Sequence, residues 1–228
     1  MRIAILPAGG EGNRMAAYRP MPKQLLPLNG GWVIDYALEA ARHCGAWPHI
    51  IVPSDNQKIA RYVEGKVGFC SFSYATSNLL ASIYQLRPIF GKAQILYIMP
   101  DTVFEPLGAA GEMLAKLDFP VVVGIFRTVT PQKLGMCVLS ARDTYGERYI
   151  VAVEDKPIHW LNEEPFAWGL LAWREPFWDC LAQVRADNMT AVLAKAIETF
   201  GPLPTVWLNQ YIDIGDPEDY ERALSGGW

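Results

Sequence analysis

Short apolar runs alternate with helical patterns along the first half of the chain, and this alternation constrains the fold more than any other feature. The first run, residues 2–6, has the length of a strand, and a helical pattern begins near Trp32 and ends near Gly45. Further strand-like segments follow at residues 49–52, 70–74 and 95–99, of which 70–74 alternates at period two, and helical stretches lie between them at 56–63 and 78–86. Strands that alternate with helices indicate a parallel sheet that is covered on both faces.

The second half of the chain has a different pattern. Strand-like segments at residues 120–126, 136–139, 149–153 and 166–173 have few helices between them. Two helical stretches, residues 176–184 and 189–200, precede a last strand near Val206. We therefore predict an α/β fold, with a Rossmann-like mixed sheet flanked by helices and an inserted antiparallel lobe. No change in composition marks a linker, so residues 1–228 are expected to form a single domain.

The composition excludes several classes of protein. Of the 228 residues, 51% are hydrophobic and 19% are charged, which provides enough apolar surface to offset the entropy lost on folding. The 20 basic and 24 acidic side chains give a net charge of −4, which argues against a nucleic-acid partner. The apolar runs are too short to cross a bilayer, and the N-terminus lacks the features of a signal peptide.

The cysteines indicate a reducing compartment. Cys44, Cys70, Cys137 and Cys180 lie far apart, and no CxxC pair or cluster of Cys and His is present. Buried free thiols are the simplest interpretation. We expect a cytoplasmic protein without a membrane partner.

A glycine-rich loop follows the first strand directly. Gly9, Gly10 and Gly12 let the backbone adopt conformations that other residues disfavour and approach a ligand closely. Successive backbone N–H groups in such a loop can bind an anion, and Arg14 and Lys23 add cations suited to phosphate oxygens. The P-loop pattern GxxxxGK[ST] is absent, and the dinucleotide-binding fingerprint lacks its third glycine.

Seven short motifs, spread in order along the chain, carry a family resemblance. They are residues 6–15 (LPAGGEGNRM), 22–28 (PKQLLPL), 99–101 (MPD), 133–136 (KLGM), 153–157 (VEDKP), 168–171 (WGLL) and 211–215 (YIDIG). Together they resemble the signature of the sugar-1-phosphate nucleotidyltransferases, and they are most similar to the glucose-1-phosphate thymidylyltransferase group. The resemblance covers almost the whole chain.

The resemblance implies a reaction in which a nucleoside triphosphate and a sugar 1-phosphate give a nucleotide sugar and pyrophosphate. A phosphate monoester is largely dianionic at neutral pH, so its in-line attack on the α-phosphorus needs no strong general base. Catalysis then depends on positioning and on charge neutralisation, which the resemblance assigns to Arg14 and Lys23. Nucleotide contacts are expected from Ala8, Gly9, Gly10, Gly12, Asn13, Arg14 and Asn78.

The resemblance also implies a Mg²⁺ cofactor. Asp101 and Asp213 each follow an apolar run of strand length, and two carboxylates at adjacent strand ends can hold one Mg²⁺ between the two substrates. Residues 1–118 would form the nucleotide-binding half and residues 119–228 the sugar-binding half. The expected contacts to the sugar phosphate are Gly135, Glu154, Asp155, Lys156 and Gly169.

The chain departs from the family pattern at three places. Asn13 stands where many relatives have Ser or Thr, and Asp155 stands in the place of a Glu, one methylene longer. Residues 74–82 lack the glutamine that reads the pyrimidine in thymidylyltransferases, so the base and the sugar stay open. Two alternatives also stay open: a cytidylyltransferase acting on a non-sugar phosphate, and a non-catalytic protein that binds nucleotide sugars. Homo-oligomer formation is likewise open.

Overall fold

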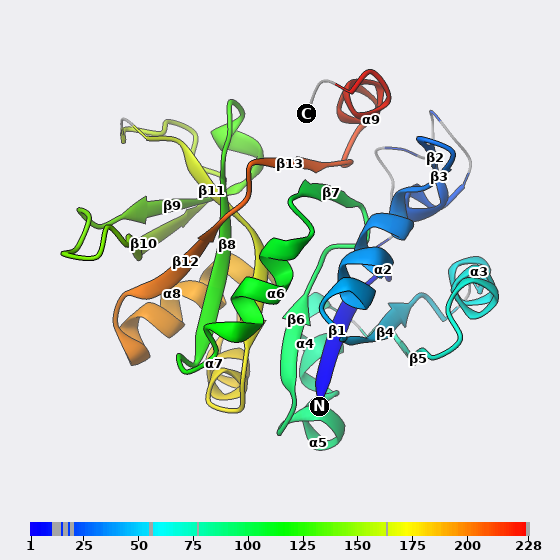
Figure 1. Ribbon diagram of the computed structural model, residues 1–228, viewed down its shortest axis with the longest axis horizontal. Coiled ribbons are helices and arrows are strands. Elements are labelled where there is room, and N and C mark those ends of the chain that lie inside the picture. Colours follow the sequence, from blue (N-terminus) through cyan, green and yellow to red (C-terminus); the bar gives the residue numbers. More distant parts are fainter. Residues whose placement is uncertain are drawn as a thin grey trace.

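The computed structural model describes residues 1–10, 15, 18, 21–54, 57–76, 78–162 and 164–226. Within these residues, nine strands form one sheet in the order β5-β4-β1-β6-β11-β8-β12-β10-β9 (Figure 1). In that order the strands are Ser71–Tyr74, Trp47–Val52, Arg2–Pro7, Gln94–Tyr97, Phe166–Trp173, Val121–Arg127, Leu203–Trp207, Tyr149–Asp155 and Gly135–Leu139. The predicted elements are present, with bounds that differ by no more than three residues.

The two halves of the chain share this sheet. Strands β5, β4, β1 and β6 are parallel to one another, as the alternation of strands and helices predicts. Strand β11 runs antiparallel to β6 and β8, while β12 runs parallel to β8. Strands β10 and β9 complete the far edge in antiparallel pairing. The predicted α/β fold with a mixed sheet is confirmed, and the antiparallel strands extend the first sheet instead of forming a second one.

Helices cover both faces of the sheet. Helices α2, α3 and α6 pack on one face, and α4, α5, α7 and α8 pack on the other (Figure 1). In numerical order these helices are Val33–His43, Lys58–Lys66, Leu79–Tyr84, Arg87–Phe90, Gly108–Ala115, Phe177–Gln183 and Met189–Phe200. Along β1, Ala4 and Leu6 belong to the first core and Ile3 and Ile5 to the second, because successive strand side chains point to opposite faces.

A smaller third core joins the C-terminal segment to the N-terminal one. Strands β7 (Thr102–Glu105) and β13 (Gln210–Asp213) form a separate antiparallel pair, and helix α9 (Pro217–Leu224) follows β13. Tyr220 of α9 is buried, and its hydroxyl donates to the carbonyl of Pro27 at 2.7 Å. Pro27 lies in the short hairpin of β2 (Pro27–Leu28) and β3 (Gly31–Trp32). This contact places the end of the chain beside the segment that carries the N-terminal motifs.

Two further expectations concern membranes and cysteines. Among the helices that the structure describes, none has both the length and the apolar character needed to cross a lipid bilayer. All four cysteines are free thiols, and Cys44, Cys137 and Cys180 are buried.

His49 makes the stability of the protein depend on pH. Its ring nitrogens lie 2.8 Å from Ser71 Oγ and 3.0 Å from Ser73 Oγ, and its side chain is buried. Burial lowers the pKa of His49 from 6.5 to about 4. The unfolded chain therefore binds more protons between these two values, so stability is complete above pH 6.5 and is lost as the pH falls towards 4. We expect a loss of about 2 to 3 kcal/mol in the free energy of unfolding.

Urea unfolding at a series of pH values measures this effect. His49→Gln is the matched variant, because it keeps a polar side chain but cannot take up a proton in this range. The difference between the wild type and the variant should depend on pH only between 6.5 and 4. A constant difference across that range would contradict the assignment to His49.

Candidate functional site

A pocket of about 390 Å³ opens at the end of β1. It is lined mainly by the glycine-rich loop, the segment that leads into α4, the turn after β6 and the loop before α8. The lining residues are Pro7, Gly9, Gly10, Lys23, Gln24, Ile51, Ala75, Thr76, Asn78, Leu79, Ser82, Met99, Asp101 and Asp187. A Cβ atom on Gly9 would lie 2.5 Å from Ala75 Cβ, so only glycine lets the loop pass this close to the neighbouring segment. A Cβ on Gly10 would meet open space.

The glycine-rich loop is described only in part. Ala8 is buried, and its backbone N–H donates to the carbonyl of Ile51 at 2.7 Å, which ties the start of the loop to β4. Gly12, Asn13 and Arg14, predicted to bind nucleotide, lie outside the described residues.

Lys23 and Asp101 form an ion pair at the floor of this pocket. Lys23 lies in a turn of 3-10 helix, Lys23–Leu25, and its Nζ contacts Asp101 Oδ2. The Asp101 side chain is only 3% exposed and that of Lys23 is 16% exposed. The second oxygen of Asp101, Oδ1, is buried and has no hydrogen-bond partner among the described residues. A buried carboxylate oxygen without a donor is costly, and this one is available to a ligand.

Asp213 lies next to Asp101, although the two are far apart in the sequence. In the β7–β13 ladder, Asp213 is paired with Thr102, and the N–H of Ile214 donates to the carbonyl of Asp101 at 2.9 Å. The expectation that the two carboxylates meet at neighbouring strand ends therefore agrees with the backbone. The ladder that joins them is the short antiparallel pair and not the parallel edge of the large sheet.

Two tyrosines, the buried Tyr97 and the half-buried Tyr211, lie close enough to both carboxylates for the charges to shift their pKa values. Burial raises the pKa of Tyr97, and the nearby carboxylates Asp101 and Asp213 raise it further. The same causes raise the pKa of Tyr211 well above its ordinary value, with burial again the largest. Both phenols therefore stay protonated and uncharged at neutral pH.

The residues around Asp101 fit a magnesium ion. Mg²⁺ is usually held by one or two carboxylates, with substrate phosphates and water as the remaining ligands. Asp101 offers its unpaired Oδ1, and Asp213 supplies a second carboxylate beside it. No cluster of three or more His, Cys, Asp or Glu suited to a metal occurs in the described ranges. The donor set thus corresponds to a site that is completed by substrate.

Polar side chains before α4 line the other side of the pocket. Asn78 caps the helix, and its side-chain carbonyl accepts from the N–H of Ala81 at 2.7 Å, so a contact with a nucleotide would use the amide donors. Asp187, which the sequence did not single out, accepts from the N–H of Leu80 at 3.2 Å and also lines the pocket. Its position follows from tertiary packing of the loop before α8, which leaves no local signal in the sequence.

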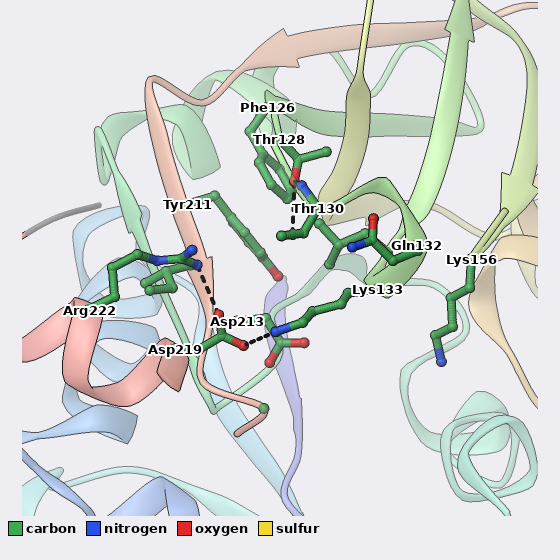
Figure 2. A pocket seen from close by; sticks show the side chains of 13 residues that line it. Phe126, Thr128, Thr130, Gln132, Lys133, Lys156, Tyr211, Asp213, Asp219 and Arg222 are labelled. Carbon is green, nitrogen blue, oxygen red and sulfur yellow. Dashed lines mark hydrogen bonds and ion pairs between the residues drawn. The ribbon is translucent and has the colours of Figure 1, made fainter. Parts of the chain in front are cut away.

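A second pocket, of about 310 Å³, lies on the side of Asp213. Figure 2 shows Lys133, Lys156, Tyr211 and Asp213 around it. Of the two neighbouring carboxylates, Asp101 therefore lines the first pocket and Asp213 lines the second. Lys156 has a φ of +46°, a left-handed conformation that is uncommon outside glycine and is often found at functional sites.

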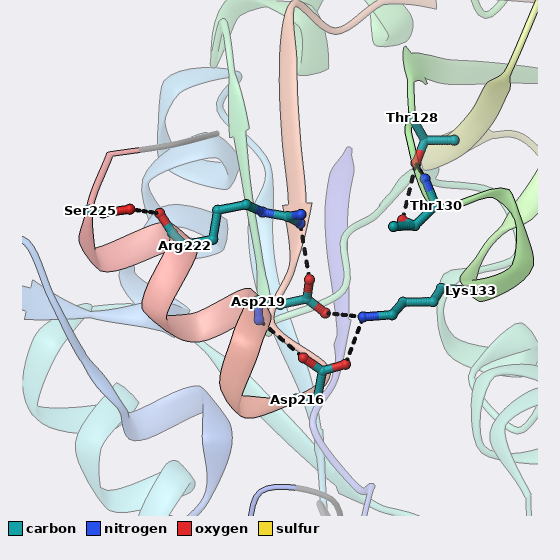
Figure 3. Close-up of polar contacts among 7 residues, drawn as sticks. All are labelled: Thr128, Thr130, Lys133, Asp216, Asp219, Arg222 and Ser225. Carbon is teal, nitrogen blue, oxygen red and sulfur yellow. Dashed lines mark hydrogen bonds and ion pairs between the residues drawn. The ribbon is translucent and has the colours of Figure 1, made fainter.

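A network of charges closes one side of the second pocket (Figure 3). Lys133 Nζ donates to Asp216 Oδ2 at 2.9 Å and to Asp219 Oδ2 at 3.4 Å, and Arg222 donates to Asp219 Oδ1 at 3.0 Å. The hydrogen bond to Asp216 raises the pKa of Lys133, so this lysine stays charged. The network ties the turn after β8 to helix α9, and the motif at residues 133–136 had not indicated it.

The remaining residues predicted to bind the sugar lie along β9, β10 and β11. Glu154 and Asp155 are exposed at the end of β10, and Asp155 is paired with Gly135 in the β9–β10 ladder. A Cβ atom on Gly135 would overlap Trp168 and Thr190, and one on Gly169 would lie 2.5 Å from the Tyr211 ring. Packing therefore accounts for both glycines. None of these four residues lines either pocket, and their contact with a sugar stays a prediction.

A family model for the MobA-like NTP transferase domain matches residues 4–195 of the sequence. The chain belongs to the MobA-like NTP transferase family. The match spans the glycine-rich loop, Lys23 and Asp101, and it ends before Asp213. No curated protein matches the sequence of this NTP transferase.

Solved structures share the fold of this NTP transferase over nearly its whole length. A protein assigned as a glucose-1-phosphate thymidylyltransferase from Bacillus anthracis, in complex with sucrose, has a TM-score of 0.85 and 16% identity, covering 99% of this chain and 94% of the other. A UDP-glucose pyrophosphorylase complexed with UDP-glucose has a TM-score of 0.84 and 17% identity, covering 100% and 98%. An inositol-1-phosphate CTP transferase from T. maritima has a TM-score of 0.80 and 17% identity, covering 99% and 95%. The family model and the solved structures therefore confirm the resemblance seen in the motifs, in that the chain has the family and the fold of an NTP transferase.

Proposed function

We propose that this NTP transferase joins a nucleoside triphosphate to a sugar 1-phosphate and releases pyrophosphate. The observation that carries the proposal is the meeting of Asp101, Asp213 and Lys23, which come from three distant motifs. A pair of carboxylates, one of them buried, with an adjacent lysine and a pocket on each side, suits a reaction in which a nucleotidyl group passes from one phosphate to another. The structural relatives include proteins named for nucleotide transfer to glucose 1-phosphate and inositol 1-phosphate, which supports a phosphorylated polyol as acceptor.

The first pocket would hold the triphosphate. The backbone of Gly9 and Gly10 lines it, and the open space at Gly10 leaves room for phosphate oxygens. Lys23 has three donors, so it can keep its contact with Asp101 and still donate to the α-phosphate. Asn78 is positioned to offer its amide to the nucleotide. Arg14 would neutralise the departing pyrophosphate.

Asp101 and Asp213 would hold Mg²⁺. The ion, when bound, supplies charge neutralisation for the phosphate oxygens of both substrates. The burial of Asp101 keeps its carboxylate in one place and limits competition from water. Asp213 is held by the β7–β13 ladder, which fixes its backbone next to that of Asp101.

The acceptor would enter from the side of Lys156. Its ammonium, carried by a backbone in an unusual conformation, would hold the acceptor phosphate. Glu154 and Asp155 would accept hydrogen bonds from acceptor hydroxyls, because each carboxylate can accept several. The attacking phosphate oxygen needs no base, since the monoester is already ionised at neutral pH.

A pyrophosphate-release assay tests the proposal. It pairs each of the common NTPs with a panel of sugar 1-phosphates and with inositol 1-phosphate, in the presence of Mg²⁺. Release with a sugar 1-phosphate supports the proposal, and release with inositol 1-phosphate alone supports the non-sugar alternative. If the protein binds a nucleotide sugar but no pair of NTP and acceptor releases pyrophosphate, the proposal that it is an enzyme is overturned.

A further inference from the structure

Asp155, at the end of β10, is held by a chain of two hydrogen bonds that starts at Trp168 on β11. The indole Nε1 of Trp168, on β11, donates to Thr190 Oγ1 at 3.0 Å. The hydroxyl of Thr190 donates in turn to Asp155 Oδ1 at 3.2 Å. The three side chains thus connect β11, the start of α8 and the end of β10.

The direction of this chain is fixed by its chemistry. An indole N–H can only donate and an ionised carboxylate can only accept, so the single proton of the Thr190 hydroxyl must point towards Asp155. The first oxygen of Asp155 is thereby occupied by a donor from the protein. No described residue donates to the second oxygen, Oδ2, and the side chain is exposed. Asp155 therefore presents Oδ2 as a free acceptor in a fixed orientation.

The surrounding packing supports the chain. Thr190 is only 3% exposed, and a Cβ atom on Gly135 would overlap both Thr190 Oγ1 and Trp168 Nε1. Gly135 is also paired with Asp155 in the β9–β10 ladder, so the residue that leaves room for the chain lies opposite the residue at its end. At its end, Asp155 is followed directly by Lys156, which lines the second pocket, and Asp187, three residues before Thr190, lines the first.

We propose that Thr190 is a positioning residue, which fixes the Asp155 carboxylate so that Oδ2 accepts a hydrogen bond from one hydroxyl of a phosphorylated polyol. This inference rests on the proposed function and adds to it a residue outside every motif of the sequence. Loss of the Thr190 hydroxyl frees Asp155 to rotate and weakens acceptor binding, while the chemical step and the NTP site are unaffected.

Steady-state kinetics of Thr190→Val test the inference, with glucose 1-phosphate or the sugar 1-phosphate of highest rate in the panel as acceptor. Valine keeps the shape of threonine and removes its hydroxyl. We expect KM for the acceptor to rise on the order of tenfold, with kcat and KM for the NTP unchanged. Thr190→Ser should restore the wild-type KM. Thr199→Val is the matched control, because Thr199 is on the same helix, is exposed and donates to the carbonyl of Lys195, away from Asp155.

Singly deoxygenated derivatives of the acceptor identify the hydroxyl that is bound. The derivative without that hydroxyl should have the same KM in the wild type and in Thr190→Val. An unchanged KM for the intact acceptor in Thr190→Val overturns the inference and leaves the proposed function standing. Absence of turnover with every pair of substrates overturns the function, and the inference with it.

The indole N–H resonances in a ¹H–¹⁵N spectrum report on the hydrogen bonds without turnover. Trp168→Phe identifies the resonance of Trp168. Thr190→Val and Asp155→Asn should both shift it, because the Thr190 hydroxyl links the two residues, whereas Thr199→Val should not. If the Trp168 resonance has the same chemical shift in the wild type, in Thr190→Val and in Asp155→Asn, and the variants fold normally, the inference is overturned.

Discussion

Replacement of Asp101 by Asn should lower kcat roughly 10²- to 10³-fold. The substitution keeps the size of the side chain but removes the charge that pairs with Lys23 and the unpaired oxygen that we assign to the metal. Asp213→Asn should have a similar effect, because we assign it to the same metal ion and the β7–β13 ladder ends beside Asp101. The double variant should be little worse than the poorer single variant, since residues that act as one unit are not additive. Pyrophosphate release at saturating substrate measures all three.

The matched control for this experiment is Asp118→Asn. Asp118 is exposed between α6 and β8, and its side chain forms no ion pair with the residues that the structure describes. Its substitution should leave kcat unchanged. Thermal unfolding of each variant separates loss of activity from loss of fold. An Asp101→Asn enzyme that is folded and retains activity within about fivefold would contradict the metal assignment.

Gly169→Ala should destabilise the protein by about 2 to 3 kcal/mol. Gly169 lies at an irregularity in the pairing of β11 with β8, and the added Cβ would lie 2.5 Å from the ring of Tyr211. That ring cannot easily move away, because it is stacked on Phe126 with ring centres 4.2 Å apart. Since Tyr211 precedes Asp213 in β13, activity should fall together with stability. Urea unfolding measures the first effect and pyrophosphate release the second.

Two variants make this prediction specific to the Tyr211 contact. Gly111→Ala, in helix α6, adds a Cβ whose nearest neighbour is 3.8 Å away, and it should be neutral or stabilising by up to about 1 kcal/mol. In a Tyr211→Leu background, Gly169→Ala should cost less than it does alone, because the obstructing ring is gone. A Gly169→Ala protein as stable as the wild type would show that this strand packs more loosely than the structure indicates.

The larger elements of the fold could be predicted from local pattern. The parallel strands β1, β4 and β6 are short apolar runs because both of their faces are buried, whereas the edge strand β5 alternates and is only partly buried. Helix α8 was predicted with its observed bounds, Met189–Phe200. Helices α6 and α9 and strand β7 were not predicted. Helix α6 is apolar nearly all round, which hides its periodicity, and β7 has only four residues, which gives too short a pattern. Helix α9 does begin with a local signal, the cap Asp216 followed by Pro217.

The residues of the candidate site that lie within sequence motifs could be predicted. Lys23, Asp101 and Asp213 were named from separate motifs, and the structure brings them together. The roles of Asp187 and Thr190 could not be predicted, because both depend on how the start of α8 packs against α4 and β10, and such packing leaves no periodic or spacing signal. The sugar roles of the predicted acceptor residues, and the role of Arg14, stay predictions.

The fate of the α-phosphate of the NTP tests most directly whether the protein transfers a nucleotidyl group to a sugar 1-phosphate. An NTP labelled at that phosphorus is incubated with the protein, Mg²⁺ and a sugar 1-phosphate, and the products are separated and counted. If the protein catalyses the proposed reaction, the label will appear in a nucleotide sugar, with one pyrophosphate released for each molecule formed. It will appear there only when the acceptor is present. Label in free nucleotide monophosphate or diphosphate, or consumption of NTP that does not depend on the acceptor, would contradict the proposed reaction.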